Sequence, residues 1–226
     1  FALPEVGGVI GAFVAWRSGL LKLTWIPLFS IAALWLYSTN LKRSLVIGNV
    51  LVATLTALVP LSVGLYEIPL LAKLFADPVV IAAGGEAYQM EAGFIIELWW
   101  WVLGFAGFAF LSSLVRELQK DMADVKGDAA VGCRTVPIVW GMRRAKALAL
   151  FDMGMIIAGL MTIRFLFLHD QLSYWYIGVG ITAPLLLSAG STYNAVSRIE
   201  HKRAGNLMKL AMVLAVGFAF LIRYLP

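Results

Sequence analysis

Four acidic residues recur at helical spacing in one polar stretch of the chain, residues 116–137. They are Glu117, Asp121, Asp124 and Asp128. Steps of three and four residues place side chains on one face of a helix, so these acids would form a single stripe over about three turns. Crowded carboxylates repel one another and need a cation, and carboxylate oxygens with room left for substrate phosphates suit Mg²⁺. The stripe therefore predicts a magnesium site.

Basic residues lie just off this stripe. Lys120, Lys126 and Arg134 belong to the same stretch, and lysine and arginine hold the outer oxygens of phosphates and diphosphates. Glu117 can pair with Arg116 or Lys120 instead of a metal. The stretch therefore predicts a site for a phosphate-bearing substrate.

Three other interpretations remain open for the same residues. A charged stretch after a membrane helix is often only a solvated loop. A transporter or channel with an acidic cation-binding vestibule also needs carboxylates, although transporters usually bind near mid-membrane. A non-catalytic membrane subunit is the third alternative.

The composition is that of a polytopic membrane protein. Hydrophobic residues make up 61% of the 226 residues, whereas a soluble domain has about 45–50%. A membrane-spanning helix needs about 20 mostly apolar residues, and we predict seven spans in one all-α transmembrane helical bundle covering residues 1–226. Between the third and fourth spans, residues 66–92 are predicted to form an extended loop with a short interfacial helix at residues 68–75. The predicted spans are residues 2–16, 23–38, 44–65, 94–115, 145–168, 172–196 and 204–225.

The basic residues are distributed unevenly between the two sides of these spans. Twelve of the eighteen lysines and arginines lie in segments on one side, five lie on the other, and Lys209 lies within a span. The positive-inside rule places the richer side, and the acidic stripe with it, in the cytoplasm. The formal charge of +5 comes from these loops, so it does not indicate nucleic-acid binding. We expect an integral protein of the cell membrane.

Three segments reach the cytoplasmic side together: the end of the second span, the acidic stripe and the connection between the last two spans. Polar residues near these span ends would form a cup above an apolar interior, which suits an amphiphile with a charged head and a long hydrocarbon tail. The candidate pocket or acceptor-binding residues are Tyr37, Asn49, Tyr193, Asn194, Arg198 and Lys202.

The acidic stretch resembles a known motif. The segment from Lys120 to Asp128, KDMADVKGD, followed by GCRTVP at 132–137 and Trp140-Gly141, is similar to the second aspartate-rich motif of the UbiA-type intramembrane prenyltransferases. Tyr37 and Lys42, with Gly48-Asn49 further on, are similar to that family's tyrosine–lysine loop.

The resemblance implies a fold and a reaction. The family has about nine spans and a first aspartate-rich motif that has no counterpart here, so we expect about two helices upstream of residue 1. Two Mg²⁺ ions would bridge acidic motifs to the diphosphate of a prenyl donor, with Asp121, Asp124 and Asp128 as the catalytic metal ligands. Lys42, Lys120, Lys126 and Arg134 would help to hold the diphosphate. The prenyl group would pass to a lipophilic acceptor within the membrane. The motif looks most like the branch that transfers geranylgeranyl to geranylgeranylglyceryl phosphate, and aromatic acceptors of the quinone or chlorophyll pathways remain the alternative.

Overall fold

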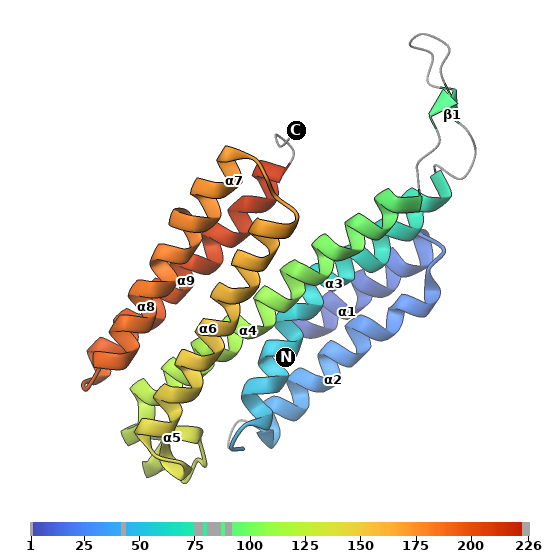
Figure 1. Cartoon of the computed structure of the whole chain (residues 1–226). Coiled ribbons are helices and arrows are strands. Elements are labelled where there is room, and N and C mark those ends of the chain that lie inside the picture. The colour runs from blue at the N-terminus through green and yellow to red at the C-terminus, as the bar shows by residue number, and fades with distance from the viewer. Residues whose placement is uncertain (1, 42–43, 75–78, 81–86, 89–91, 223–226) are drawn as a thin grey trace. The chain divides into compact units, whose positions relative to one another are not determined.

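The computed structural model describes residues 2–41, 44–74, 79–80, 87–88 and 92–222 (Figure 1). This part of the chain is almost wholly helical. Six of its helices are long and apolar enough to cross a membrane. The predicted all-α, polytopic membrane fold is therefore confirmed.

The chain divides into two compact units. The first comprises Phe1–Thr39 and Thr54–Phe108, and the second comprises Asn40–Ala53 and Ala109–Pro226. Two long helices, α3 (Ile47–Leu74) and α4 (Ala92–Ala130), contribute residues to both units.

The first unit begins with α1 (Ala2–Arg17), the 3-10 turn η1 (Leu21–Thr24) and α2 (Trp25–Thr39). Glycine lets its helices approach closely, as is common between membrane helices. A Cβ atom at Gly11 of α1 would lie 2.8 Å from Pro27 of α2, and one at Gly64 of α3 would lie 2.7 Å from Val102 of α4. Two short antiparallel strands, β1 (Val79–Val80) and β2 (Ala87–Tyr88), lie between α3 and α4.

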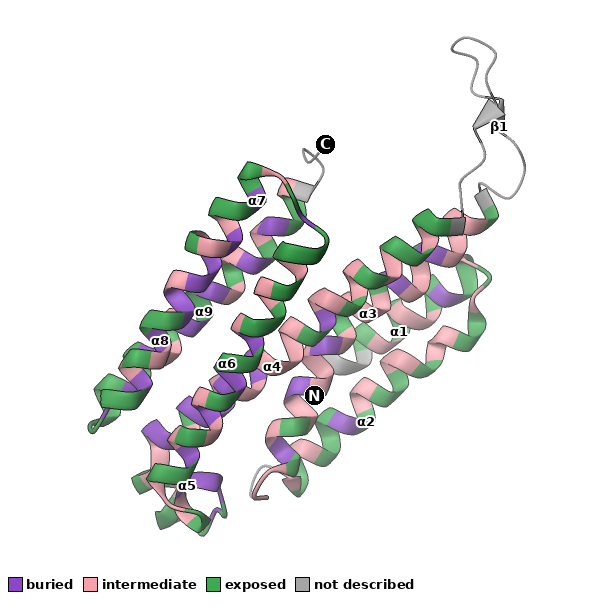
Figure 2. Ribbon diagram, in the orientation of Figure 1, coloured by how far each residue is buried: buried purple, intermediate pink, exposed green. Residues whose placement is uncertain are grey.

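The second unit holds the ends of α3 and α4 and the rest of the chain. Its further elements are α5 (Val136–Val139), α6 (Met142–Leu166), α7 (Gln171–Trp175), the π-helical turn η3 (Tyr176–Ile181), α8 (Thr182–Asn194) and α9 (Arg198–Ile222). Buried residues, drawn purple in Figure 2, lie on the faces by which these helices pack. One buried cluster joins the end of α4 to α5 and α6 and consists of Leu118, Met122, Val136, Ala145 and Ala149. This apolar contact holds the polar end of α4 in place.

Two predicted boundaries differ from the structure. The first predicted span corresponds to α1, which has only 16 residues and is about 24 Å long, shorter than the hydrocarbon core of a bilayer. Of the seven predicted spans, the other six correspond to helices of the described residues that are long and apolar enough to cross a membrane. The break predicted at residue 66 was wrong, because α3 continues to Leu74 with Pro60 and Pro69 inside it. The helix predicted at residues 68–75 is the end of α3 and not a separate element, and most of the predicted loop beyond it lies outside the described residues. Membrane helices tolerate internal proline because neighbouring groups satisfy the carbonyl that it leaves free.

Candidate active site at the acidic end of α4

The acidic stripe lies on the last turns of α4. This helix has 39 residues, which corresponds to about 58 Å and exceeds the roughly 30 Å of a bilayer core. Residues 115–126 are mostly good helix formers, so the helix continues from its apolar part into the acidic part without a break. It ends where Gly132 adopts a φ of 73° and the Cys133 backbone N–H donates to the Asp128 carbonyl. The predicted helical arrangement of the acids is confirmed.

Asp121 is held by a residue from α3. The side-chain amide of Asn49 donates to Asp121 Oδ2 over 2.8 Å. Asn49 lies in the first turn of α3, so this hydrogen bond connects residues 72 positions apart. It orients the carboxylate and occupies one of its two oxygens.

Asp124 is held by the first residue of α9. Two nitrogens of Arg198 donate to Asp124 Oδ1, Nη2 over 2.6 Å and Nε over 3.1 Å. The sequence placed Arg198 among the pocket or acceptor-binding residues, and the structure places it directly against a predicted metal ligand. Its guanidinium supplies part of the positive charge that the crowded carboxylates require.

The other two acids of the stripe differ from each other. Glu117 is buried and pairs with both Arg116, over 2.7 Å, and Lys120, over 3.1 Å. The hypothesis that Glu117 pairs with one of these cations is therefore confirmed. Asp128, one helical turn beyond Asp124, is half-buried.

The carboxylate oxygens of the acidic stripe show which kind of metal site these residues could form. Within the described ranges, no group of three or more His, Cys, Asp and Glu side chains is arranged to hold a metal ion alone. Mg²⁺ in enzymes commonly takes one or two protein carboxylates and completes its shell with water and substrate phosphate oxygens. Asp121 and Asp124 each direct one oxygen to a partner, and their remaining oxygens fit a metal shared with a substrate. They do not fit a closed protein cage.

Gln119 is the residue that the sequence interpretation missed. It is only 1% exposed, and its Nε2 donates to the hydroxyls of Ser188, over 3.0 Å, and Thr192, over 2.9 Å, both on α8. The Ser188 hydroxyl in turn donates to the Ala204 carbonyl of α9. Gln119 therefore fixes the acidic end of α4 relative to α8 and α9. The sequence did contain a signal for this contact. Ser188 and Thr192 lie four positions apart in an apolar span, and such a pair marks a polar face on a membrane helix.

The remaining predicted residues occupy several places. Tyr193 is 68% exposed, and its carbonyl accepts from Lys146 over 2.8 Å. Asn194 donates to the Gly190 carbonyl on its own helix. Tyr37 lies on α2 in the first unit, and Lys42 lies outside the described residues. The exposed cations near the acidic end are Lys120, Lys126, Arg134 and Lys202.

Comparison with known proteins gives one family and several named relatives. A digeranylgeranylglyceryl phosphate synthase from Thermococcus sibiricus is 30% identical over 197 residues, covering 84% of this chain and 56% of the relative. Proteins of the same name from Thermococcus kodakarensis and Methanobrevibacter smithii are 30% and 28% identical and cover 94% and 93% of this chain and 64% and 66% of the relatives. No solved structure gives a significant match.

The chain thus spans a little over half to two thirds of the length of these three relatives. The family model described as the UbiA prenyltransferase family matches residues 6–213. This match includes the acidic stripe and all of its partners described above. It confirms the resemblance of the acidic motif, and the chain belongs to the UbiA prenyltransferase family.

Proposed function

We propose that the protein transfers a geranylgeranyl group from geranylgeranyl diphosphate to geranylgeranylglyceryl phosphate at the cytoplasmic face of the membrane. Membership of the UbiA prenyltransferase family supports the reaction class. The name shared by the relatives, digeranylgeranylglyceryl phosphate synthase, supports the acceptor. Because the chain spans only part of each relative, the activity is proposed for the whole protein.

One observation carries the proposal. Asp121 and Asp124 lie on one face of α4, and each has one oxygen held by a residue from a different helix, Asn49 or Arg198. Carboxylates oriented in this way are prepared to bind a cation together with a charged substrate, because little rearrangement is needed on binding.

The family generally uses a divalent metal, and we take it to be Mg²⁺ here. Asp121, Asp124 and Asp128 would hold it together with diphosphate oxygens. When bound, the metal would neutralise the diphosphate and make it a better leaving group. A single acidic helix face with free carboxylate oxygens is consistent with this arrangement.

The chain's own residues would then bind and orient the two substrates. Exposed Lys120, Lys126 and Arg134, with Lys42, would hold the outer oxygens of the donor diphosphate. Arg198 lies close enough to the acids to exchange its carboxylate partner for a diphosphate oxygen. Apolar helix faces would hold the isoprenoid tail and keep water away from the developing allylic cation.

The acceptor would approach from the same side. Its phosphate would use Lys202, with Tyr193 and Asn194 as further candidate contacts. Its hydroxyl oxygen forms the new ether bond to the prenyl carbon, the carbon–oxygen bond to diphosphate breaks, and the hydroxyl proton is released.

A transfer assay tests the acceptor directly. Full-length protein in liposomes would receive labelled geranylgeranyl diphosphate and, in turn, geranylgeranylglyceryl phosphate, 4-hydroxybenzoate and dihydroxynaphthoate. We expect transfer to the glyceryl phosphate lipid alone. Transfer only to an aromatic acid would overturn the ether-lipid assignment and leave prenyl transfer in place, whereas no transfer to any acceptor would count against both.

A further inference from the structure

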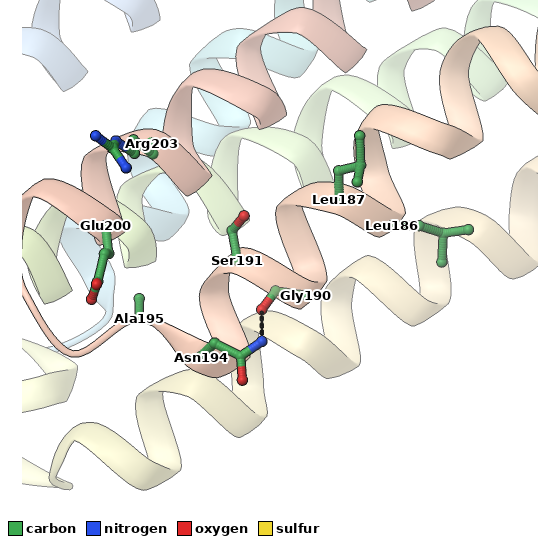
Figure 3. A pocket seen from close by; sticks show the side chains of 8 residues that line it. All are labelled: Leu186, Leu187, Gly190, Ser191, Asn194, Ala195, Glu200 and Arg203. Carbon is green, nitrogen blue, oxygen red and sulfur yellow. Dashed lines mark hydrogen bonds between the residues drawn. The ribbon is translucent and has the colours of Figure 1, made fainter.

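A groove runs along the hairpin formed by α8 and α9 within the second unit (Figure 3). Its volume is about 430 Å³, within the usual range for a small-ligand site. Leu186 and Leu187 of α8 line one end, and Glu200 and Arg203 from the first turns of α9 line the other. The groove is therefore apolar at one end and charged at the other.

Small side chains form the floor of the groove. Gly190 and Ala195 line it, and a Cβ atom at Gly190 would meet no other atom within 4 Å. Asn194 folds back to donate to the Gly190 carbonyl over 3.0 Å, as the dashed line in Figure 3 shows. A chain-like ligand can therefore lie close to the backbone of α8.

The charged end of the groove presents a cation. The Glu200 carboxylate accepts the backbone N–H groups of Val196, over 2.6 Å, and Ser197, over 2.8 Å, so it is engaged in holding the α8–α9 connection. Arg203 is exposed, and it interacts electrostatically with the Glu200 carboxylate. Because backbone N–H groups already engage that carboxylate, the planar guanidinium can still bind a phosphate group.

The groove lies where two candidate membrane spans end. These spans are Gln171–Asn194 and Arg198–Leu221, so the connection between them marks the membrane boundary. Leu186 and Leu187 precede that boundary by about 10–12 Å along the helix. Both are more than half exposed, at 57% and 61%, as expected of residues that face hydrocarbon chains. The cation therefore lies near the membrane boundary and the two leucines lie deeper. This order matches that of a phospholipid, which has its phosphate at the boundary and its hydrocarbon chains below.

We propose that this groove binds an anionic membrane phospholipid, with Arg203 on the headgroup phosphate and the start of a hydrocarbon chain against Leu186 and Leu187. None of the acids of α4 lines the groove. Asn194, a candidate acceptor contact, does line it. The inference uses Arg203, Leu186 and Leu187, to which no part in the transfer reaction is assigned, and it concerns a lipid of the surrounding membrane.

Photo-cross-linking locates such a lipid. Full-length protein in nanodiscs would carry a trace of phosphatidylglycerol or phosphatidylcholine with a diazirine in its acyl chain, and mass spectrometry would quantify labelling of the α8 peptide. We expect phosphatidylglycerol to label α8 at least about fivefold more than phosphatidylcholine. Both lipids carry the phosphate, but phosphatidylcholine also carries a choline cation, which the Arg203 guanidinium would repel.

Three variants separate recognition from general attraction. Arg203→Gln should lower labelling of α8 by phosphatidylglycerol about fivefold, consistent with the loss of one charged hydrogen bond. Arg144→Gln, which removes the same charge from an exposed residue outside the groove, should leave labelling nearly unchanged. Gly190→Leu should reduce labelling by filling the floor, since the Cβ atom it adds would meet no other atom within 4 Å.

The proposal is overturned if the two lipids label α8 equally, or if Arg203→Gln and Arg144→Gln reduce labelling by the same amount. It is also overturned if Gly190→Leu, with its thermal unfolding unchanged, labels as well as the wild type. Transferase activity in the same nanodiscs is a separate readout, so failure of the lipid site does not bear on the proposed reaction.

Discussion

Two substitutions of Gln119, to leucine and to glutamate, should destabilise the protein by clearly different amounts. The hydroxyls of Ser188 and Thr192 donate their hydrogens to the carbonyls of Ala204 and Ser188, so towards Gln119 each hydroxyl can only accept. Gln119 satisfies both by donating from Nε2. Leucine removes these two hydrogen bonds but leaves no donor unsatisfied. An ionised glutamate presents only acceptor oxygens to two acceptors and buries a charge, and a protonated one can donate to only one of the two hydroxyls.

The expected magnitudes follow from the two hydrogen bonds that each substitution removes and from the charge that glutamate adds. Hydrogen bonds between membrane helices average about 0.6 kcal/mol, so Gln119→Leu should cost about 1 kcal/mol. At pH 8, Gln119→Glu should cost about 3 kcal/mol or more, because the buried carboxyl either stays charged and unpaired or binds a proton that it would release in water at this pH. At roughly 2–4 °C per kcal/mol, the Tm should fall by about 3 °C for leucine and by about 6–12 °C for glutamate.

Tryptophan fluorescence during thermal unfolding in detergent provides the assay, since the chain contains eight tryptophans. Gln171→Glu is a matched control, because Gln171 is exposed at the first position of α7. The Tm of this variant should equal that of the unchanged protein. Equal losses of Tm for the two Gln119 variants would refute the hydrogen-bond directions on which the reasoning depends.

Three further predictions concern the acidic end of α4. Arg198→Gln should change the free energy of unfolding by less than about 1 kcal/mol, because the Arg198 side chain is 65% exposed. The same variant removes a cation that competes for Asp124, so calorimetry should show about threefold tighter binding of Mn²⁺ to the protein without donor. Asn49→Leu should lower kcat/KM for prenyl transfer about tenfold or more, since it removes the hydrogen bond that orients Asp121; an unchanged rate would exclude that role. Cys133 is buried, so sidedness is best tested with Lys126→Cys in a Cys133→Ser background. A membrane-impermeant maleimide should label it only from the cytoplasmic side, and labelling in intact cells would invert the topology.

Local features of the site could be predicted from the sequence because they depend on spacing within one helix. Glu117, Asp121, Asp124 and Asp128 share a face simply because α4 is helical through this stretch. The pairing of Glu117 with Arg116 and Lys120 is equally local, involving residues one and three positions apart. Such pairs follow from helical geometry without any knowledge of the fold.

The hydrogen bonds that complete the site could not be predicted in the same way. The Asn49–Asp121, Arg198–Asp124 and Gln119–Ser188 hydrogen bonds join residues 72, 74 and 69 positions apart. Which helices meet, and at what rotation, depends on packing in three dimensions, which hydropathy and charge spacing do not specify.

The end of α3 shows the same limit in the fold. The sequence predicted that the span ends at residue 65 and that a separate short helix follows at residues 68–75, but one helix continues through Pro69 to Leu74. In water, proline usually ends or kinks a helix, and water solvates the backbone carbonyl that loses its hydrogen bond. Inside a membrane bundle, a helix can continue through it.

Binding of the prenyl donor with and without Mg²⁺ tests the central claim most directly. Calorimetry of the full-length protein with geranylgeranyl diphosphate should show at least about tenfold tighter binding in Mg²⁺ than in EDTA, equivalent to about 1.4 kcal/mol. Asp121→Asn should lose most of this difference, while Glu67→Gln, an exposed acid in the part of α3 that belongs to the first unit, should keep it. Equal affinity in Mg²⁺ and EDTA, or an undiminished Mg²⁺ effect in Asp121→Asn, would contradict the assignment of the acidic end of α4 as the metal and diphosphate site.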